Sequence, residues 1–183
     1  MTALTPANQL TLLRMLLIPA FVILVVYGHL GWALVTFAVA GLTDALDGLI
    51  ARRTGQKSNL GAWLDPMADK LLLLTTFVVL TLPGLGLANR LPIWLTVLIF
   101  SRDVVIVLTV AVVNLAIGPR TFRPSIFGKA ATATYIITAV VAMFFNYRGS
   151  ASAVVEFFVW ASLAITLVSS FHYIWHARQI IGT

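Results

Sequence analysis

Cysteine is absent from the 183-residue chain, and charged side chains make up only 10% of it. The lack of cysteine excludes disulfide bonds, thiolate catalysis and cysteine-ligated zinc. A soluble domain carries about a quarter charged residues, so the scarcity of charge excludes an ordinary soluble fold. Hydrophobic residues instead make up 60% of the chain. This composition predicts an integral membrane protein.

The apolar residues fall into stretches that are long enough to cross a bilayer, which takes about 20 residues per helix. Glycine, proline and polar residues separate these stretches. We expect an all-α fold of six transmembrane helices in one bundle, with residues 1–183 forming a single membrane-embedded domain. The predicted spans are residues 10–27, 32–50, 61–82, 91–117, 129–145 and 154–175.

Positive charge predicts the orientation, because cytoplasmic loops are enriched in lysine and arginine. With a cytoplasmic N-terminus, Arg90 and Arg148 lie on the outer side and Arg102 lies within a span. The other cationic residues lie on or near the cytoplasmic side: Arg14, Arg52, Arg53, Lys57, Lys70, Arg120, Arg123, Lys129 and Arg178. We therefore expect both termini to lie in the cytoplasm and the protein to reside in a bacterial inner (plasma) membrane.

The net charge of +6 is explained by loops that face anionic headgroups and polyanionic substrates, so no nucleic-acid partner is expected. Tryptophans concentrate at membrane interfaces. Trp32, Trp94 and Trp160 are predicted to anchor the outer boundary, where Glu156 is a solvated residue.

Four of the six acidic residues lie between positions 44 and 69. Asp44 and Asp47 are three residues apart, in the last two turns of the second predicted span. Asp65 and Asp69 are four apart, so each pair shares a helix face. A short hairpin joins the two helices, which should bring all four carboxylates together at the cytoplasmic membrane edge. Carboxylates inside a membrane are costly and usually functional.

Four carboxylates in one cleft repel one another unless cations neutralise them. Two divalent ions would balance the charge, and oxygen ligands favour Mg²⁺ or Mn²⁺. Pairs of metal ions held by carboxylates serve phosphoryl chemistry. Arg52 is suited to hold a diphosphate. The small residues Gly48, Ala51 and Gly61 would let a phosphate or a base approach the backbone, although helix packing explains each of them equally well.

The spacing D-x2-D-G-x2-A-R-x8-G-x3-D-x3-D, which runs from Asp44 to Asp69, resembles the signature of the CDP-alcohol phosphotransferase family at every position. The resemblance implies attack of an alcohol on the β-phosphate of CDP-diacylglycerol with release of CMP, by a homodimer that also contacts membrane lipids. It implies that Asp69 is the general base and that Asp44, Asp47, Asp65 and Asp69 hold two metal ions. The implied CDP pocket comprises Asp44, Asp47, Gly48, Ala51, Arg52, Gly61 and Asp65.

Two further motifs resemble the phosphatidylglycerophosphate synthase branch, whose acceptor is sn-glycerol 3-phosphate. They are N-x-x-T-x-x-R, ending at Arg14, and L-D-P-M-A-D-K, ending at Lys70. Two others resemble eukaryotic-type cardiolipin synthases, whose acceptor is phosphatidylglycerol: Ser101 to Val104, and P-S-x-x-G-K, ending at Lys129. Glycerol 3-phosphate is the first expectation. The candidates to bind an acceptor or lipid phosphate are Arg14, Arg102, Arg120, Arg123 and Lys129.

Simpler explanations exist for these cations. Arg14 could extend its charged end to the interface, Arg102 could pair with Asp103, and the other three could set topology alone. Two other activities would also use membrane aspartates. An intramembrane prenyltransferase is disfavoured because its motifs lack the D-G-x2-A-R continuation. A divalent-cation transporter would place its site near the midplane, whereas these aspartates are expected at helix ends.

Overall fold

The computed structural model describes residues 6–54, 59–117 and 125–181, and all of its regular elements there are helices. The six helices are α1 (Pro6–Val26), α2 (Leu30–Thr54), α3 (Asn59–Thr81), α4 (Ile93–Ile117), α5 (Ile126–Tyr147) and α6 (Ala153–Ile181). Each predicted span has one helix as its counterpart. An all-α fold is therefore confirmed for the described residues.

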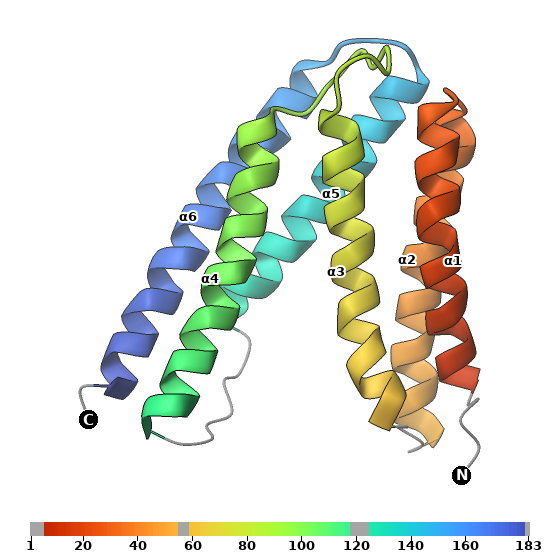
Figure 1. Ribbon diagram of the computed structural model, residues 1–183. Coiled ribbons are helices and arrows are strands. Elements are labelled where there is room, and N and C mark those ends of the chain that lie inside the picture. The colour runs from red at the N-terminus through yellow and green to blue at the C-terminus, as the bar shows by residue number, and fades with distance from the viewer. Residues whose placement is uncertain (1–5, 55–58, 118–124, 182–183) are drawn as a thin grey trace.

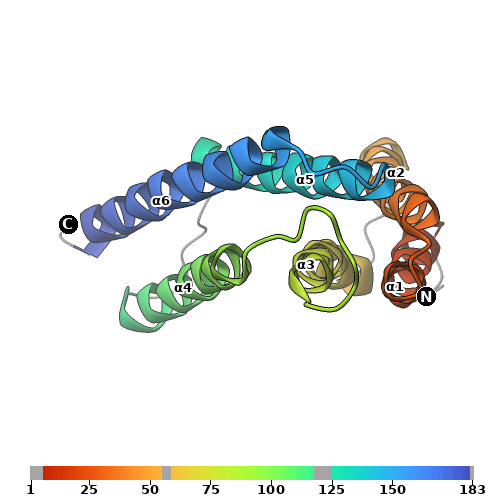
Figure 2. The same cartoon turned by 90° about the horizontal axis from the view of Figure 1, so that it is seen from above.

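The helices are arranged in two layers of three (Figure 2). One layer contains α2, α5 and α6, and the other contains α1, α3 and α4. Neighbours within a layer touch, and α1 packs on α2, α3 on α5, and α4 on α6 across the layers. The helix α1 therefore contacts both helices that carry the acidic motif.

The two ends of the bundle differ in character (Figure 1). The connections 27–29, 82–92 and 148–152 all lie at one end, which we call the turn end. Gly28 and Gly149 have positive φ of 76° and 64° there, a conformation that suits glycine. The start of α1, the end of α6 and the adjoining ends of α2 and α3 lie at the other end, which we call the acidic end. The first helix therefore starts, and the last helix ends, at the same end of the bundle.

The helix α2 is longer than the span predicted for residues 32–50. Asp44 lies in the last two turns of that predicted span, whereas α2 continues to Thr54, about three turns beyond Asp44. Within the described side chains of α2, an apolar stretch covers Leu30–Asp44, and the helix backbone continues through a segment whose sequence carries Arg52 and Arg53.

The interior combines aromatic packing with hydrogen bonds between helices. Phe21 of α1 packs on Phe37 of α2 with ring centroids 6.2 Å apart. Between α5 and α6, the Thr138 and Ser162 hydroxyls lie 2.8 Å apart. Such contacts are important in a bilayer, because lipid tails are as apolar as leucine and give helices little hydrophobic reason to associate.

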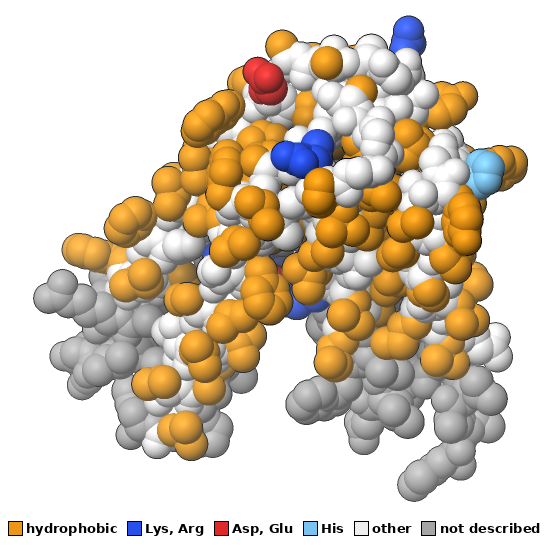
Figure 3. All heavy atoms as spheres, turned by 45° about the horizontal axis from the view of Figure 1, so that its top comes forward, with side chains coloured by type: hydrophobic (Ala, Val, Ile, Leu, Met, Phe, Trp, Pro, Cys, Tyr) orange, Lys and Arg blue, Asp and Glu red, His pale blue; other side chains and the backbone are white. Residues whose placement is uncertain are grey.

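Hydrophobic side chains are widespread on the face shown in Figure 3, and many large hydrophobic side chains of the described residues are exposed. Leu16, Ile93 and Phe171 are each at least 70% exposed, which a water-soluble surface rarely tolerates over a wide area. Among the described residues, four helices are long and apolar enough to cross a membrane, in the windows Gln9–Val26, Ile93–Val112, Ile126–Tyr147 and Ala153–Trp175. These features identify an integral membrane protein.

Candidate active site

Arg14 of α1 is buried between the two helices of the acidic motif. Its side chain is 0% exposed. Its Nη1 donates to Asp69 Oδ1 at 2.5 Å and lies 3.0 Å from Asp44 Oδ1. One guanidinium nitrogen thus joins a carboxylate of α2 to a carboxylate of α3. The alternative in which Arg14 extends to the membrane interface is wrong, because these carboxylates hold its charged end inside the bundle.

The positions of these three residues follow from helix packing. Thr11 lies one turn before Arg14 and is also 0% exposed, so this face of α1 is directed into the bundle. On α2, Thr43 is buried and donates to Ala40 O. On α3, Ala68 is 0% exposed, and its small side chain allows close helix approach. Buried neighbours on all three helices therefore fix where the charged groups meet.

The site has the properties of a cation site. Asp44 and Asp69 belong to different helices, yet both direct an oxygen at one positive group. Their side chains are each 45% exposed, so an ion could reach them from outside the bundle. Carboxylate oxygens are the donors that Mg²⁺ and Mn²⁺ prefer. These two aspartates therefore fit the proposed metal, although no group of three or more ligands is present among the described residues.

The remaining residues of the predicted metal and CDP site lie outside the described side chains. They are Asp47, Gly48, Ala51, Arg52, Gly61 and Asp65, whose backbones belong to α2 and α3. Arg120 and Arg123 lie within residues 118–124 and are also outside the described part. Their predicted roles stay predictions.

A second polar cluster surrounds Arg102 of α4, which is 9% exposed. Its Nη1 donates to Asp103 Oδ1 at 3.0 Å, which confirms the predicted pairing. Its Nη2 donates to Ser169 Oγ of α6 at 3.0 Å. Among the described atoms, its buried Nε has no hydrogen-bond partner. A buried donor of this kind is costly when it is left unpaired.

Two lysines lie close to this cluster. Lys70 of α3, next in sequence to Asp69, places Nζ 3.3 Å from Asp103 Oδ2. A β-carbon added to Gly128 of α5 would lie 3.4 Å from Arg102 Nη2, so Arg102 reaches the start of α5. Lys129 follows there and is exposed. Sequence reasoning did not single out Lys70 as a functional residue, although its position directly after Asp69 was the available signal.

Comparison with known proteins identifies the family. Residues 4–168 match the CDP-alcohol phosphatidyltransferase family. This chain belongs to that family. The match includes α1 to α5 completely, the first part of α6 as far as residue 168, and the complete motif from Asp44 to Asp69.

Relatives within the CDP-alcohol phosphatidyltransferases carry two different names. A probable phosphatidylglycerophosphate synthase of Mycobacterium tuberculosis is 32% identical over 96% of this chain and 83% of its own length. A CMP-forming cardiolipin synthase of Streptomyces coelicolor is 32% identical over 86% of this chain and 74% of its own. The human CMP-forming cardiolipin synthase is 34% identical over 94% of this chain and 61% of its own.

Family membership makes this protein a phosphatidyl-transferring membrane enzyme. The names of its relatives are consistent with transfer from CDP-diacylglycerol. The identities to the two kinds of synthase are similar, so they do not choose between the acceptors. That choice has to be argued from the residues around the site.

Proposed function

We propose that this enzyme transfers the phosphatidyl group of CDP-diacylglycerol to sn-glycerol 3-phosphate, releasing CMP. The observation that carries the proposal is the convergence of Asp44 and Asp69 on a single cationic group from two different helices. An acidic site built to hold positive charge is what a diphosphate substrate with its counterions requires.

In the proposed reaction, the acceptor hydroxyl oxygen attacks the β-phosphorus of CDP-diacylglycerol. A new P–O bond forms, the P–O bond to CMP breaks, and CMP leaves with the bonding electrons. An Asp69 carboxylate oxygen takes the hydroxyl proton, as a positioned general base can. Arg14 would hold Asp69 in place through the Nη1 contact.

Asp44, Asp47, Asp65 and Asp69 would hold two Mg²⁺ or Mn²⁺ ions, which supply charge stabilisation for the leaving phosphate when bound. The cytidine and diphosphate would contact Gly48, Ala51, Arg52 and Gly61 together with the first three aspartates. All of these residues belong to α2 and α3, so one helix hairpin would bind the donor substrate. The lipid tails would remain in the bilayer.

The choice of glycerol 3-phosphate rests on the cluster around Arg102. A phosphate dianion needs more than one cation. Lys70 and Arg102 both contact Asp103, and Lys129 follows Gly128, which lies close to Arg102. The unpaired Arg102 Nε offers a further donor. Lys70 is the residue after Asp69, so a phosphate held here would keep its hydroxyl near the proposed base. Arg120 and Arg123 would add charge.

Phosphatidylglycerol is the second candidate acceptor. Asp103 accepts a hydrogen bond from Arg102 and forms an ion pair with Lys70, which reduces the positive charge left for a dianion. The phosphodiester of phosphatidylglycerol carries only one negative charge and therefore needs less positive charge in its binding site. Relatives named cardiolipin synthase share about a third of the residues.

The proposal extends to placement in the cell. Six spans, cytoplasmic termini and a cytoplasm-facing site in a bacterial inner membrane follow from the charge bias. The start of α1 and the end of α6 lie at the same end of the bundle, which supports this topology (Figure 1). We further propose that the enzyme is a homodimer, as the family resemblance implies.

The test is CMP release from CDP-diacylglycerol by the purified full-length protein with Mg²⁺, with glycerol 3-phosphate, phosphatidylglycerol and inositol phosphate as separate acceptors. We expect release with glycerol 3-phosphate. Asp69→Asn should retain CDP-lipid binding and lose turnover by at least about 100-fold. Glu156→Gln, which removes a carboxylate at the turn end, is the matched control and should leave turnover unchanged.

Each result separates the parts of the proposal. CMP release with phosphatidylglycerol alone would show that phosphatidylglycerol is the acceptor, and the proposed phosphatidyl transfer would still stand. Release with none of the three acceptors from folded protein would overturn the reaction itself. Near-normal turnover of Asp69→Asn would remove Asp69 as the base.

A further inference from the structure

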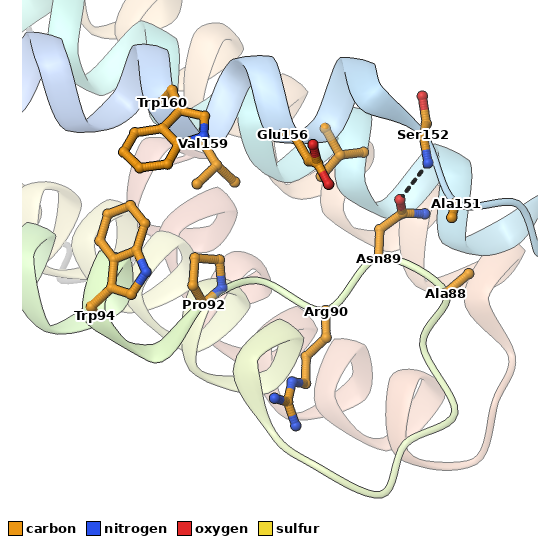
Figure 4. A pocket seen from close by; sticks show the side chains of 11 residues that line it. Ala88, Asn89, Arg90, Pro92, Trp94, Ala151, Ser152, Glu156, Val159 and Trp160 are labelled. Atoms are coloured by element: carbon orange, nitrogen blue, oxygen red, sulfur yellow. Dashed lines mark hydrogen bonds between the residues drawn. The ribbon is translucent and has the colours of Figure 1, made fainter.

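A cavity of about 460 Å³ opens at the turn end of the bundle, away from the end where α2 ends and α3 starts. It lies between the α3–α4 connection and the first turns of α6 (Figure 4). Its volume falls within the range of small-molecule sites, about 300–1,000 Å³. The proposed reaction makes no use of this cavity.

The wall formed by the α3–α4 connection is held in place by hydrogen bonds. Asn89 is 9% exposed. Its Nδ2 donates to Ser150 O at 2.7 Å, and its Oδ1 accepts from Ser152 N at 2.8 Å. Its backbone N–H donates to Asn146 Oδ1 at 2.6 Å. A segment fixed to both α5 and the α5–α6 turn gives the cavity a defined shape before any ligand binds, which lowers the entropy cost of binding.

Two opposite charges line the cavity without pairing. Glu156 stands on α6, and Arg90 stands on the connection across from it, with its side chain extending away from Glu156 (Figure 4). Neither takes part in the ion pairs found among the described residues. Both are exposed. A ligand that carries both a negative and a positive group would therefore complement this cavity, whereas a ligand with only negative charge would meet Glu156 unfavourably.

Two tryptophans form a further part of the cavity wall. Trp94 of α4 and Trp160 of α6 face each other with ring centroids 5.8 Å apart, and they are 41% and 62% exposed. Tryptophan rings attract cations and gather at the level of lipid headgroups. The candidate spans Ile93–Val112 and Ala153–Trp175 both begin at this cavity. The cavity therefore lies at the boundary between the apolar part of the bundle and its turn end.

We propose that this cavity binds the headgroup of a zwitterionic phospholipid in the leaflet opposite the active site. Arg90 holds the phosphate, and Glu156 with the tryptophan pair holds the ammonium group. The acyl chains leave past Trp94 and Trp160 along the apolar surfaces of α4 and α6. The bound lipid adds a link between α4 and α6 at the turn end, beside the tryptophan pair.

The test uses native mass spectrometry of the detergent-solubilised full-length protein, titrated with phosphatidylethanolamine, phosphatidylcholine or phosphatidylglycerol. We expect one phosphatidylethanolamine or phosphatidylcholine to bind at least about fivefold more tightly than phosphatidylglycerol. Arg90→Gln and Glu156→Gln should each weaken zwitterionic binding by about fivefold, the upper range for one exposed charge interaction.

The matched control is Arg148→Gln, which removes an exposed arginine at the same end but outside the cavity. This variant should bind lipid as the wild type does. CMP release should stay at the wild-type level in all three variants, which verifies that they are folded. Equal binding of phosphatidylglycerol and the zwitterionic lipids by the wild type would overturn the proposal. So would equal lipid binding by Arg90→Gln, Glu156→Gln and Arg148→Gln.

Discussion

Replacing Arg14 by glutamine is expected to destabilise the bundle, because this residue joins three helices at one point. The substitution removes the charge while keeping a polar side chain of moderate length. Asp44 on α2 and Asp69 on α3 would lose their shared cationic partner. The two carboxylates would then repel each other across the interface between these helices.

The size of the effect follows from burial. Removing one partner of a fully buried ion pair costs about 3–5 kcal/mol. Arg14 is 0% exposed, but both aspartate side chains are 45% exposed, so water can solvate them again. A hydrogen bond to a charged group contributes about 1.5–3 kcal/mol. We therefore expect a loss of about 2 kcal/mol in the free energy of unfolding, or about 30-fold in the equilibrium constant.

The measurement is reversible unfolding in mixed micelles, in which rising dodecyl sulfate is followed by tryptophan fluorescence and circular dichroism. Arg14→Lys should lose less than Arg14→Gln, because it keeps the charge. Arg148→Gln removes an exposed arginine at the turn end and controls for the change in net charge. An unfolding midpoint for Arg14→Gln equal to that of Arg148→Gln would refute the reasoning.

Two further predictions concern other polar contacts. In steady-state assays, Lys70→Gln should raise the KM for glycerol 3-phosphate about tenfold, because one charge-assisted contact is lost. The KM for CDP-diacylglycerol should stay constant. Equal rises in both KM values would exclude Lys70 from acceptor binding. A double-mutant cycle of Thr138→Val and Ser162→Ala, measured by unfolding in micelles, should give a coupling free energy of about 0.6 kcal/mol, because the two hydroxyls lie 2.8 Å apart. A coupling free energy of zero would mean that this hydrogen bond adds nothing to the α5–α6 contact.

Much of the fold was predictable because the bilayer imposes simple rules on sequence. A backbone in hydrocarbon must satisfy its own hydrogen bonds, so long apolar stretches form helices. The predicted span 91–117 differs from α4 by two residues. The end of α2 was harder to predict, because its last turn carries Arg52, Arg53 and Thr54 and is polar, yet it continues as helix. Apolar length marks where a membrane segment ends, but it does not mark where a helix ends.

The candidate site was predictable in part. Local spacing identified the four aspartates, since residues three or four apart share a helix face whatever the tertiary structure. Arg102 and Asp103 were predicted to pair because an aspartate inside a membrane span needs a positive partner, and they do. The partner of Asp69 was not predictable in this way, because Arg14 is 55 positions distant and no periodicity relates α1 to α3.

The sequence by itself determined the helices, the family motif and the pairs of aspartates, because these depend on composition and on spacing along one chain segment. Only the tertiary structure decided that Arg14 of α1 contacts aspartates on both α2 and α3. It also decided that Lys70 of α3 pairs with Asp103 of α4, and that Arg90 and Glu156 line one cavity. The physical reason is that contacts between helices depend on how the helices pack together, and packing is set by the whole bundle rather than by any single segment.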